Sequence, residues 1–235
     1  NIHADEYGMN PYVAAFSHGF FELAERAREL GCTVDEGYAL LYSARLAHLP
    51  AIEAMIATGI DINSRRERLN DQTTAIEQAI TTNDIPGEEG EKADKRLEAI
   101  EYLLANGADP NTLDDDGQPI LYLAIENSYN DPRVVMSLIE HGADTSNPDK
   151  KTGQTPFFQV VRHADKALLL SFLTGADGID IEVTDPEGNT ALHVYFKENS
   201  YFDISYIRAT VALGVPLEPT NNEGKSVLDI LNEKR

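Results

Sequence analysis

Apolar residues recur along this chain at intervals of three and four positions, in short blocks separated by polar, glycine-containing segments. The blocks at residues 100–104 and 134–139 are two examples. This spacing places the apolar side chains on one face of an α-helix. We therefore expect short amphipathic helices that pack against one another, with little or no sheet outside the connecting loops.

Two motifs mark the beginning and the end of a repeating unit. The first, residues 185–196, reads Asp-Pro-Glu-Gly-Asn-Thr-Ala-Leu-His-Val-Tyr-Phe. Gly188 suits a tight bend, because glycine adopts a positive φ without a steric penalty, and Thr190 occupies the N-cap position of a helix. The second, residues 103–111, reads Leu-Leu-Ala-Asn-Gly-Ala-Asp-Pro-Asn.

These motifs resemble the opening, D-x-x-G-x-T-P-L-H-x-A-A, and the end, L-L-x-x-G-A-D-x-N, of an ankyrin repeat. Residues 185–196 depart from the pattern at Ala191, Tyr195 and Phe196. The resemblance implies an all-α, ankyrin-repeat solenoid of helix-turn-helix units with projecting β-hairpin or finger loops. It also implies that His193 forms a hydrogen bond towards the neighbouring repeat.

The family pattern, moved along the chain, predicts about six repeats and a C-terminal half-cap in a single domain, residues 1–235. The approximate limits are 11–35, 39–63, 74–111, 117–146, 153–182, 188–218 and, for the half-cap, 224–235. One unit cannot bury its apolar face alone, so we expect the units to stack into a curved array. Charged residues at 25–29 should make the second helix of the first repeat a solvated cap.

Residues 84–95 form an insertion relative to the family pattern, between the two helices of the third repeat. Pro86, Gly87 and Gly90 disfavour helix, and most of the charges are acidic. The pattern predicts a solvated loop. The alternative is an arm that contacts a partner, because insertions in repeat proteins map to loops that often bind.

Motifs for catalysis or for cofactor binding are not apparent. Gly224-Lys225-Ser226 resembles the end of a phosphate-binding loop, but Pro219 stands where that loop requires its first glycine. Residues 114–117 resemble part of a calcium loop, but no glutamate follows at the required distance. The sequence therefore predicts neither a cofactor nor a metal site, and no catalytic residues.

The single cysteine and the six histidines also favour structural roles. Cys32 occupies a packed position of the repeat, and His48, His141 and His193 stand where ankyrin repeats themselves often carry histidine. His163 ends a predicted first helix on the expected binding face, where it is interpreted as a contact or a bystander rather than a general base.

The net charge of −21 and the pI near 4.5 exclude several classes of ligand. Nucleic acid and anionic membranes would be repelled, whereas a protein with a basic surface would associate faster through long-range attraction. The alternative is that the charge serves solubility alone. A soluble chain is expected because no apolar run approaches a membrane span; a cytoplasmic location is favoured, and a periplasmic or secreted one would require a signal peptide removed before Asn1.

The resemblance further implies that partners bind at the finger tips and at the exposed side of each first helix. The finger candidates carried over by position are Arg65, Arg66, Arg68, Asn70, Asp71, Thr73, Asp115, Asp116, Gln118, Lys151, Thr152, Gln154, Pro186, Glu187 and Asn189. The first-helix candidates are Thr81, Glu126, Arg162, His163 and Lys197.

Two features of this candidate surface have two interpretations each. The basic run at 65–68 either binds an acidic patch of a partner or pairs with neighbouring fingers, notably Asp114–Asp116. Tyr122 and Phe158 replace the histidine of the motif, and they either pack between repeats or offer aromatic anchors to a partner.

The sequence thus predicts a protein–protein interaction module that binds a basic protein through a concave finger and helix face. One alternative is an inhibitor or immunity protein that neutralises a toxin or enzyme. Another is a structural adaptor that joins two proteins. An enzyme is the competing class, and it is disfavoured because no two candidate groups show catalytic spacing.

Overall fold

The structure, a computed structural model, describes residues 9–68, 71–82, 85, 89–127, 131–175, 178–199 and 202–233. These residues form thirteen α-helices and one two-stranded antiparallel sheet. The chain divides into two compact units, residues 1–116 and 117–235. The all-α solenoid of paired helices is confirmed, whereas the limits of the repeats and the single domain stay predictions.

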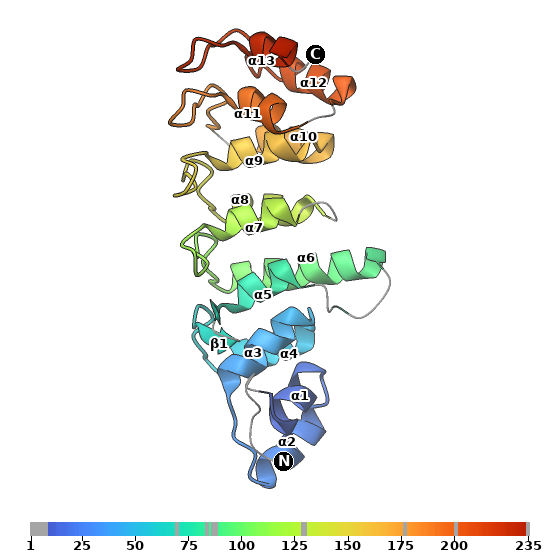
Figure 1. The fold of residues 1–235 in the computed structure, drawn as a ribbon. Coiled ribbons are helices and arrows are strands. Elements are labelled where there is room, and N and C mark those ends of the chain that lie inside the picture. Colours follow the sequence, from blue (N-terminus) through green and yellow to red (C-terminus); the bar gives the residue numbers. More distant parts are fainter. Residues whose placement is uncertain are drawn as a thin grey trace. The chain divides into compact units, whose positions relative to one another are not determined.

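Unit 1 holds the first six helices and the two strands. They are α1 (Pro11–Ser17), α2 (Phe21–Glu29), α3 (Glu36–Arg45), α4 (Leu49–Ile56), β1 (Arg66–Arg68), β2 (Asp71–Thr73), α5 (Ala75–Thr81) and α6 (Glu89–Ala105). Within the unit α1 packs on α3 and α3 on α5, while α4 packs on α6. The first helices of the pairs therefore form one layer and the later second helices another (Figure 1).

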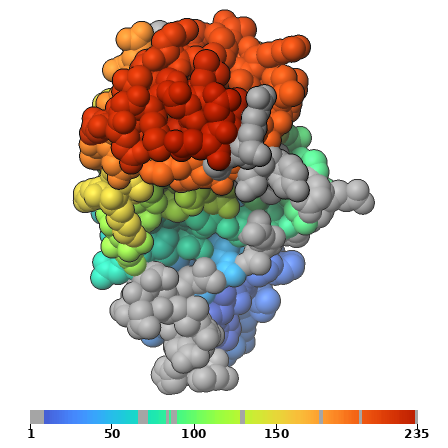
Figure 2. Space-filling view, turned by 45° about the horizontal axis from the view of Figure 1, so that its top comes forward, coloured from blue at the N-terminus to red at the C-terminus, as the bar shows by residue number. Residues whose placement is uncertain are grey.

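Unit 2 repeats the same arrangement with seven helices. They are α7 (Ile120–Glu126), α8 (Arg133–Glu140), α9 (Pro156–His163), α10 (Lys166–Gly175), α11 (Ala191–Glu198), α12 (Ile204–Ala212) and α13 (Val227–Glu233). One layer runs α7, α9, α11, α13 and the other α8, α10, α12. In the space-filling view, the C-terminal residues of the unit cover one end of it (Figure 2, orange to red).

Several helices begin at side chains that cap their free N–H groups. Asn10 precedes α1, and its Oδ1 accepts from the N–H of Val13 at 2.9 Å. Thr74 and Glu77 form a capping box at the start of α5. Such caps satisfy backbone donors that have no partner inside the helix, and they fix where each repeat starts.

Large side chains replace the small residues of the motif in α11 for a packing reason. Tyr195 and Phe196 are both buried, and the ring of Tyr195 lies 5.6 Å from that of Tyr206 on α12. The ring of Phe196 lies 4.9 Å from that of Phe202, with the two ring planes tilted by 55°. The Tyr206 hydroxyl donates to the carbonyl oxygen of Val161 at 2.9 Å, so this aromatic cluster joins consecutive helix pairs.

The predicted loop at 84–95 is wrong over its second half. Helix α6 begins at Glu89, so residues 89–95 are helical, and a Glu91–Lys95 ion pair of 2.7 Å supports that turn. Ile85 is buried, and Nη2 of Arg96 donates to the carbonyl oxygen of Thr82 at 2.6 Å. Residues 84 and 86–88 of the insertion lie outside the described residues.

The expectation of a solvated second helix in the first repeat is incomplete. The charges of α2 do lie in solvent, where Arg26 pairs with Glu29 and Arg28 with Glu25. Three large apolar side chains near and within the helix are exposed as well: Phe20, Leu23 and Leu30. The first repeat therefore has an apolar outer face rather than a polar cap.

Candidate protein-binding surface

Each finger turn of unit 2 is built around one acidic or amide side chain. Asp149, Asp185 and Asn221 stand 36 residues apart, each at the start of a turn. Oδ1 of Asp185 accepts from the backbone N–H groups of Glu187 at 3.0 Å and Asn189 at 2.8 Å. Asp149 and Asp185 are buried, so their carboxylates shape the turns and do not face a partner.

The carboxylate of Asp149 shows the electrostatic result of this arrangement. Burial alone would raise its pKa, but hydrogen bonds from the hydroxyl and the N–H of Thr152 hold the pKa below its usual value. The hydroxyl bond measures 2.7 Å and the backbone bond 2.7 Å. Hydrogen bonds to a carboxylate stabilise its charged form, so this turn keeps its shape at neutral pH.

Side-chain amides also link successive finger turns. In each link a side-chain amide donates to an oxygen of a neighbouring turn: Gln118 to Asp149 at 3.0 Å, Gln154 to Asp185 at 3.4 Å, and Asn221 to Asn189 at 2.9 Å. We call this series the finger ladder. Gln118, Gln154 and Asn189, which the sequence placed among the contact candidates, thus bind neighbouring fingers.

The finger glycines allow the turns to approach closely. Gly188 has φ +76°, and a Cβ there would lie 2.5 Å from Oδ1 and 2.9 Å from the backbone nitrogen of Asn222. That nitrogen donates to the carbonyl oxygen of Glu187 at 3.0 Å. Gly224 has φ +75° in the last finger and faces no atom within 4 Å. The tips left exposed are those at Lys151, Thr152, Pro186 and Glu187.

His193 confirms the role that the resemblance implied. The imidazole is fully buried, its Nδ1 accepts from the N–H of Thr190 at 3.2 Å, and its Nε2 lies 3.0 Å from the carbonyl oxygen of Lys225. A carbonyl only accepts, so Nε2 carries a proton. His193 therefore joins the start of α11 to the finger of the following helix.

The first-helix candidates of unit 2 form a polar row across α7, α9 and α11. Nε2 of Gln159 donates to Oε1 of Glu126 at 2.9 Å, and Arg162 donates to the side-chain oxygen of Gln159. Arg162 also lies 3.4 Å from Glu198. The sequence missed Gln159 and Glu198, although Glu198 occupies the same repeat position as His163, which it named.

Two further candidates end these helices. His163 is half-buried, and burial, with Arg162 beside it, lowers the pKa of its ring despite an opposing contribution from Asp165. The ring is therefore largely neutral at pH 7. Lys197 is exposed and lies 3.8 Å from the carboxylate of Glu187, so a helix candidate and a finger candidate meet here.

Tyr122 and Phe158 pack between repeats, and the anchor interpretation is wrong for both. Each is almost completely buried. The Tyr122 hydroxyl lies 2.7 Å from the carbonyl oxygen of Gln154 and 2.9 Å from that of Asn147. Burial raises the pKa of Tyr122 well above its usual value, so the phenol remains a hydrogen-bond donor.

In unit 1 the finger side chains also bind one another. Nη1 of Arg65 donates to the carbonyl oxygen of Gln72 at 2.7 Å and lies 3.6 Å from Asp115. Oδ2 of Asp115 accepts from the N–H of Gln72 at 2.8 Å. For Arg65, pairing with the neighbouring finger is therefore the correct interpretation of the basic run.

The remaining candidates of unit 1 are divided. Thr73 is buried, whereas Asp116 and Thr81 are exposed. Asn70 lies outside the described residues. Arg66, Arg68 and Asp71 have backbones that take part in the β1–β2 pair, but their side chains lie outside what the structure describes. The structure thus gathers Arg65 and Asp115 around Gln72 and leaves Asp116 facing solvent.

Among the described residues, no group of three or more His, Cys, Asp or Glu side chains is placed to hold a metal ion. Within the same part of the chain, no helix has both the length and the apolar character needed to cross a membrane. Cys32 is buried, as its packed position in the repeat predicted.

Comparison with known proteins agrees with the repeat pattern. Residues 92–185 match the family model "Ankyrin repeats (3 copies)". The NF-kappa-B p105 subunit of Gallus gallus is 30% identical over 108 residues, which are 45% of this chain and only 11% of that protein. Ankyrin repeats mediate protein–protein interaction and are generally non-enzymatic binding modules.

A solved structure extends the likeness in fold. It is titled "Bd0816 Predatory Endopeptidase from Bdellovibrio bacteriovorus in complex with immunity protein Bd3460". The matching chain has 20% sequence identity and a TM-score of 0.62, over 86% of this chain and 93% of that one. At this identity the likeness concerns the fold.

Proposed function

Since the chain is an ankyrin-repeat protein, we propose that it binds a partner protein through the exposed finger tips and first-helix ends of unit 2. The finger ladder is the observation that carries this proposal. It fixes the backbone of each turn and leaves the tips at Lys151, Thr152, Pro186 and Glu187 in solvent. A surface that is ordered before binding loses less conformational entropy on association.

The proposed partner has a basic surface. The support is the net charge of −21, which attracts a cationic protein over a distance of about one Debye length, roughly 8 Å at physiological salt. Buried turn carboxylates such as Asp185 are not the contact charges. Exposed finger carboxylates of unit 2 include those of Glu187 and Glu223, and they should act on the association rate.

Capture from an extract of the source organism, followed by association kinetics with the captured protein, tests this function. The test variant is the pair Glu187→Lys and Glu223→Lys, at exposed finger positions of unit 2. The control pair, Glu53→Lys and Glu140→Lys, makes the same change of charge at exposed sites of the second helices α4 and α8. Asp115 and Asp116 are left intact because they belong to unit 1.

We expect the finger pair to slow association about threefold to tenfold more than the control pair at low salt, because local charge steers docking. Equal slowing by the two pairs would show that the fingers are not the contact surface. A captured partner without a basic surface would refute the charge part of the proposal.

The second candidate is an inhibitor or immunity protein, and the chain itself is proposed not to be an enzyme. The fold likeness to a chain from the endopeptidase and immunity-protein complex covers most of both chains and favours this candidate. If the captured partner is an enzyme, titration with this chain should abolish its activity at a one-to-one ratio. Unchanged activity in the saturated complex would reject inhibition.

A further inference from the structure

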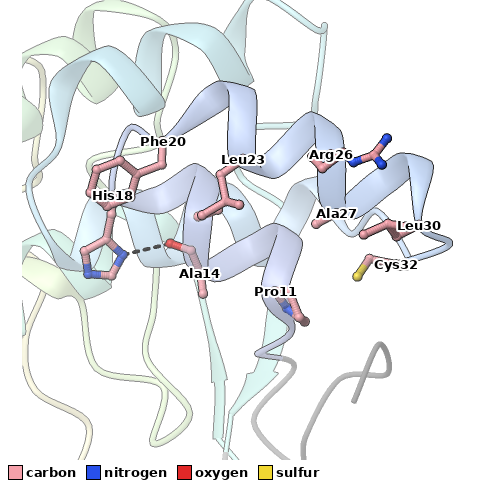
Figure 3. Close-up of a pocket in the computed structure, with 10 residues that line it drawn as sticks. Pro11, Ala14, His18, Phe20, Leu23, Arg26, Ala27, Leu30 and Cys32 are labelled. Carbon is pink, nitrogen blue, oxygen red and sulfur yellow. Dashed lines mark hydrogen bonds between the residues drawn. The ribbon is translucent and has the colours of Figure 1, made fainter.

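An open apolar groove lies on the first helix pair of unit 1. Its volume is about 660 Å³. The small side chains of Ala14 and Ala27 lie on its floor, with Cys32 at one end (Figure 3), and Ala15 also lines the groove. Larger apolar side chains from the same two helices and their connections line the rest of the groove.

Three of these large side chains are exposed to an unusual degree. Phe20 is 62% exposed, Leu23 60% and Leu30 62%. Apolar side chains gathered at one exposed site mark an interaction surface more often than scattered ones do. Arg28 and Glu25, which pair with each other at 2.7 Å, are not among the residues that line the groove.

The spacing of the lining residues fits a helix as the occupant. Along α2 and its ends they stand at positions 20, 23, 27 and 30, and along α1 at 11, 14 and 18. Steps of three and four residues on a helix form the seam that packs against another helix. From residue 20 to residue 30 the seam is about 15 Å long, or nearly three helical turns.

The polar side chains of the groove indicate the charge of that helix. His18 and Arg26 line the groove, and the described residues that line it include no Asp or Glu, although the chain as a whole is strongly acidic. Nδ1 of His18 lies 2.8 Å from the carbonyl oxygen of Ala14 and so donates to it, which leaves Nε2 towards solvent. Arg26 binds Glu29 through Nη1 at 2.6 Å and retains further N–H donors.

We infer that this groove binds one amphipathic helix of a partner protein, with leucine-like anchors at three- and four-residue steps and a carboxylate beside that stripe. The anchors fill the space over the alanine floor, and the carboxylate meets Arg26. A second copy of this chain is a poorer occupant, because two chains of charge −21 repel each other. A groove and a finger face on one chain would join two proteins, which is the adaptor activity.

Designed peptides test this inference on the full chain. The probe is a helical peptide of about 14 residues, roughly four turns, with leucine at the seam positions and glutamate beside them. A matched peptide carries glutamine in place of each glutamate. Fluorescence anisotropy of labelled peptides gives the affinity, and the rate of alkylation of Cys32 reports whether the bound peptide covers the groove.

We expect the glutamate peptide to bind and to slow Cys32 alkylation. Leu23→Glu should weaken it about tenfold or more, as loss of a central anchor does. Leu228→Glu, at a leucine of 55% exposure on α13, should leave binding unchanged. Arg26→Gln should weaken the glutamate peptide about twofold to fivefold and the glutamine peptide less, as expected of an exposed charge pair.

Three results would overturn the inference. Equal weakening by Leu23→Glu and Leu228→Glu would show nonspecific apolar binding. An unchanged preference between the two peptides after Arg26→Gln would refute the acidic partner. A protein that sediments alone as a dimer, and becomes monomeric with Leu23→Glu, would assign the groove to a second copy. None of these results depends on the finger face, so the proposed function can fail separately.

Discussion

The finger ladder of unit 2 and the groove of unit 1 reverse the usual relation between residue type and exposure. In the ladder, polar side chains such as Asp185 and Asn189 are buried and hydrogen-bonded to neighbouring turns. In the groove, Phe20, Leu23 and Leu30 are about 60% exposed. Polar residues stabilise the fold in the finger ladder, and apolar residues face solvent in the groove.

This difference shows that position within a stack decides what a repeat residue does. An internal finger has a neighbour on each side, so its amides and carboxylates find partners there. The first pair packs on later helices through α1, and no described helix beyond α1 packs closely on α2, so the apolar side chains of α2 have fewer neighbours among the described residues. Contact candidates are therefore better sought where a repeat pattern ends than where it is most regular.

The largest effect in this comparison should come from removing His193, the buried histidine that joins α11 to the next finger. His193→Ala should lower the free energy of unfolding by about 3 to 4 kcal/mol, because it creates a cavity and leaves the Lys225 carbonyl and the Thr190 N–H without their partner. Urea unfolding followed by circular dichroism measures the change. The matched control is His141→Ala.

His141 is exposed and bonds only within its own helix, to the carbonyl oxygen of Ser137 at 2.8 Å. Its replacement should cost less than about 1 kcal/mol. Similar losses for the two variants would mean that the link between consecutive fingers contributes nothing beyond an ordinary surface contact, and the contrast between ladder and groove would weaken.

A pair of glycines tests the close approach of neighbouring fingers. Gly224→Ala should cost about 1 kcal/mol, the strain of a side chain at positive φ with open space around it. Gly188→Ala has a similar φ but also forces Asn222 away, with loss of its bond to Glu187. It should cost at least about 1 kcal/mol more. Equal thermal shifts would refute the close contact.

Much of the fold was predictable because the repeat motif encodes it locally. The helix pairs, the bend at Gly188 and the link made by His193 all follow from residues 185–196. The early start of α6 was missed because the sequence signal was mixed. Gly90 disfavours helix there, but the Glu91–Lys95 pair and the anchoring of Ile85 favour it.

The candidate surface was less predictable, because a side chain's availability depends on its neighbours in space. Gln118 and Gln154 occupy finger positions that face partners in the family, yet here they donate to the turns beside them. Leu23 has the periodicity of a core residue, and only the packing shows that no described helix covers it. Sequence position identifies the surface of a repeat but not which groups on it remain unbonded.

The smallest expected effect belongs to the groove. Leu23→Ser should change the free energy of unfolding by no more than about 0.5 kcal/mol, because a side chain that is 60% exposed in the folded chain gains little from burial there. Leu228→Ser, at a leucine that is 55% exposed, should change the free energy of unfolding by a similarly small amount. A loss above about 1.5 kcal/mol for Leu23 alone would show that something covers it in the isolated protein. Leu23 would then be a core residue, like the buried His193, and the groove would not be open to a partner helix.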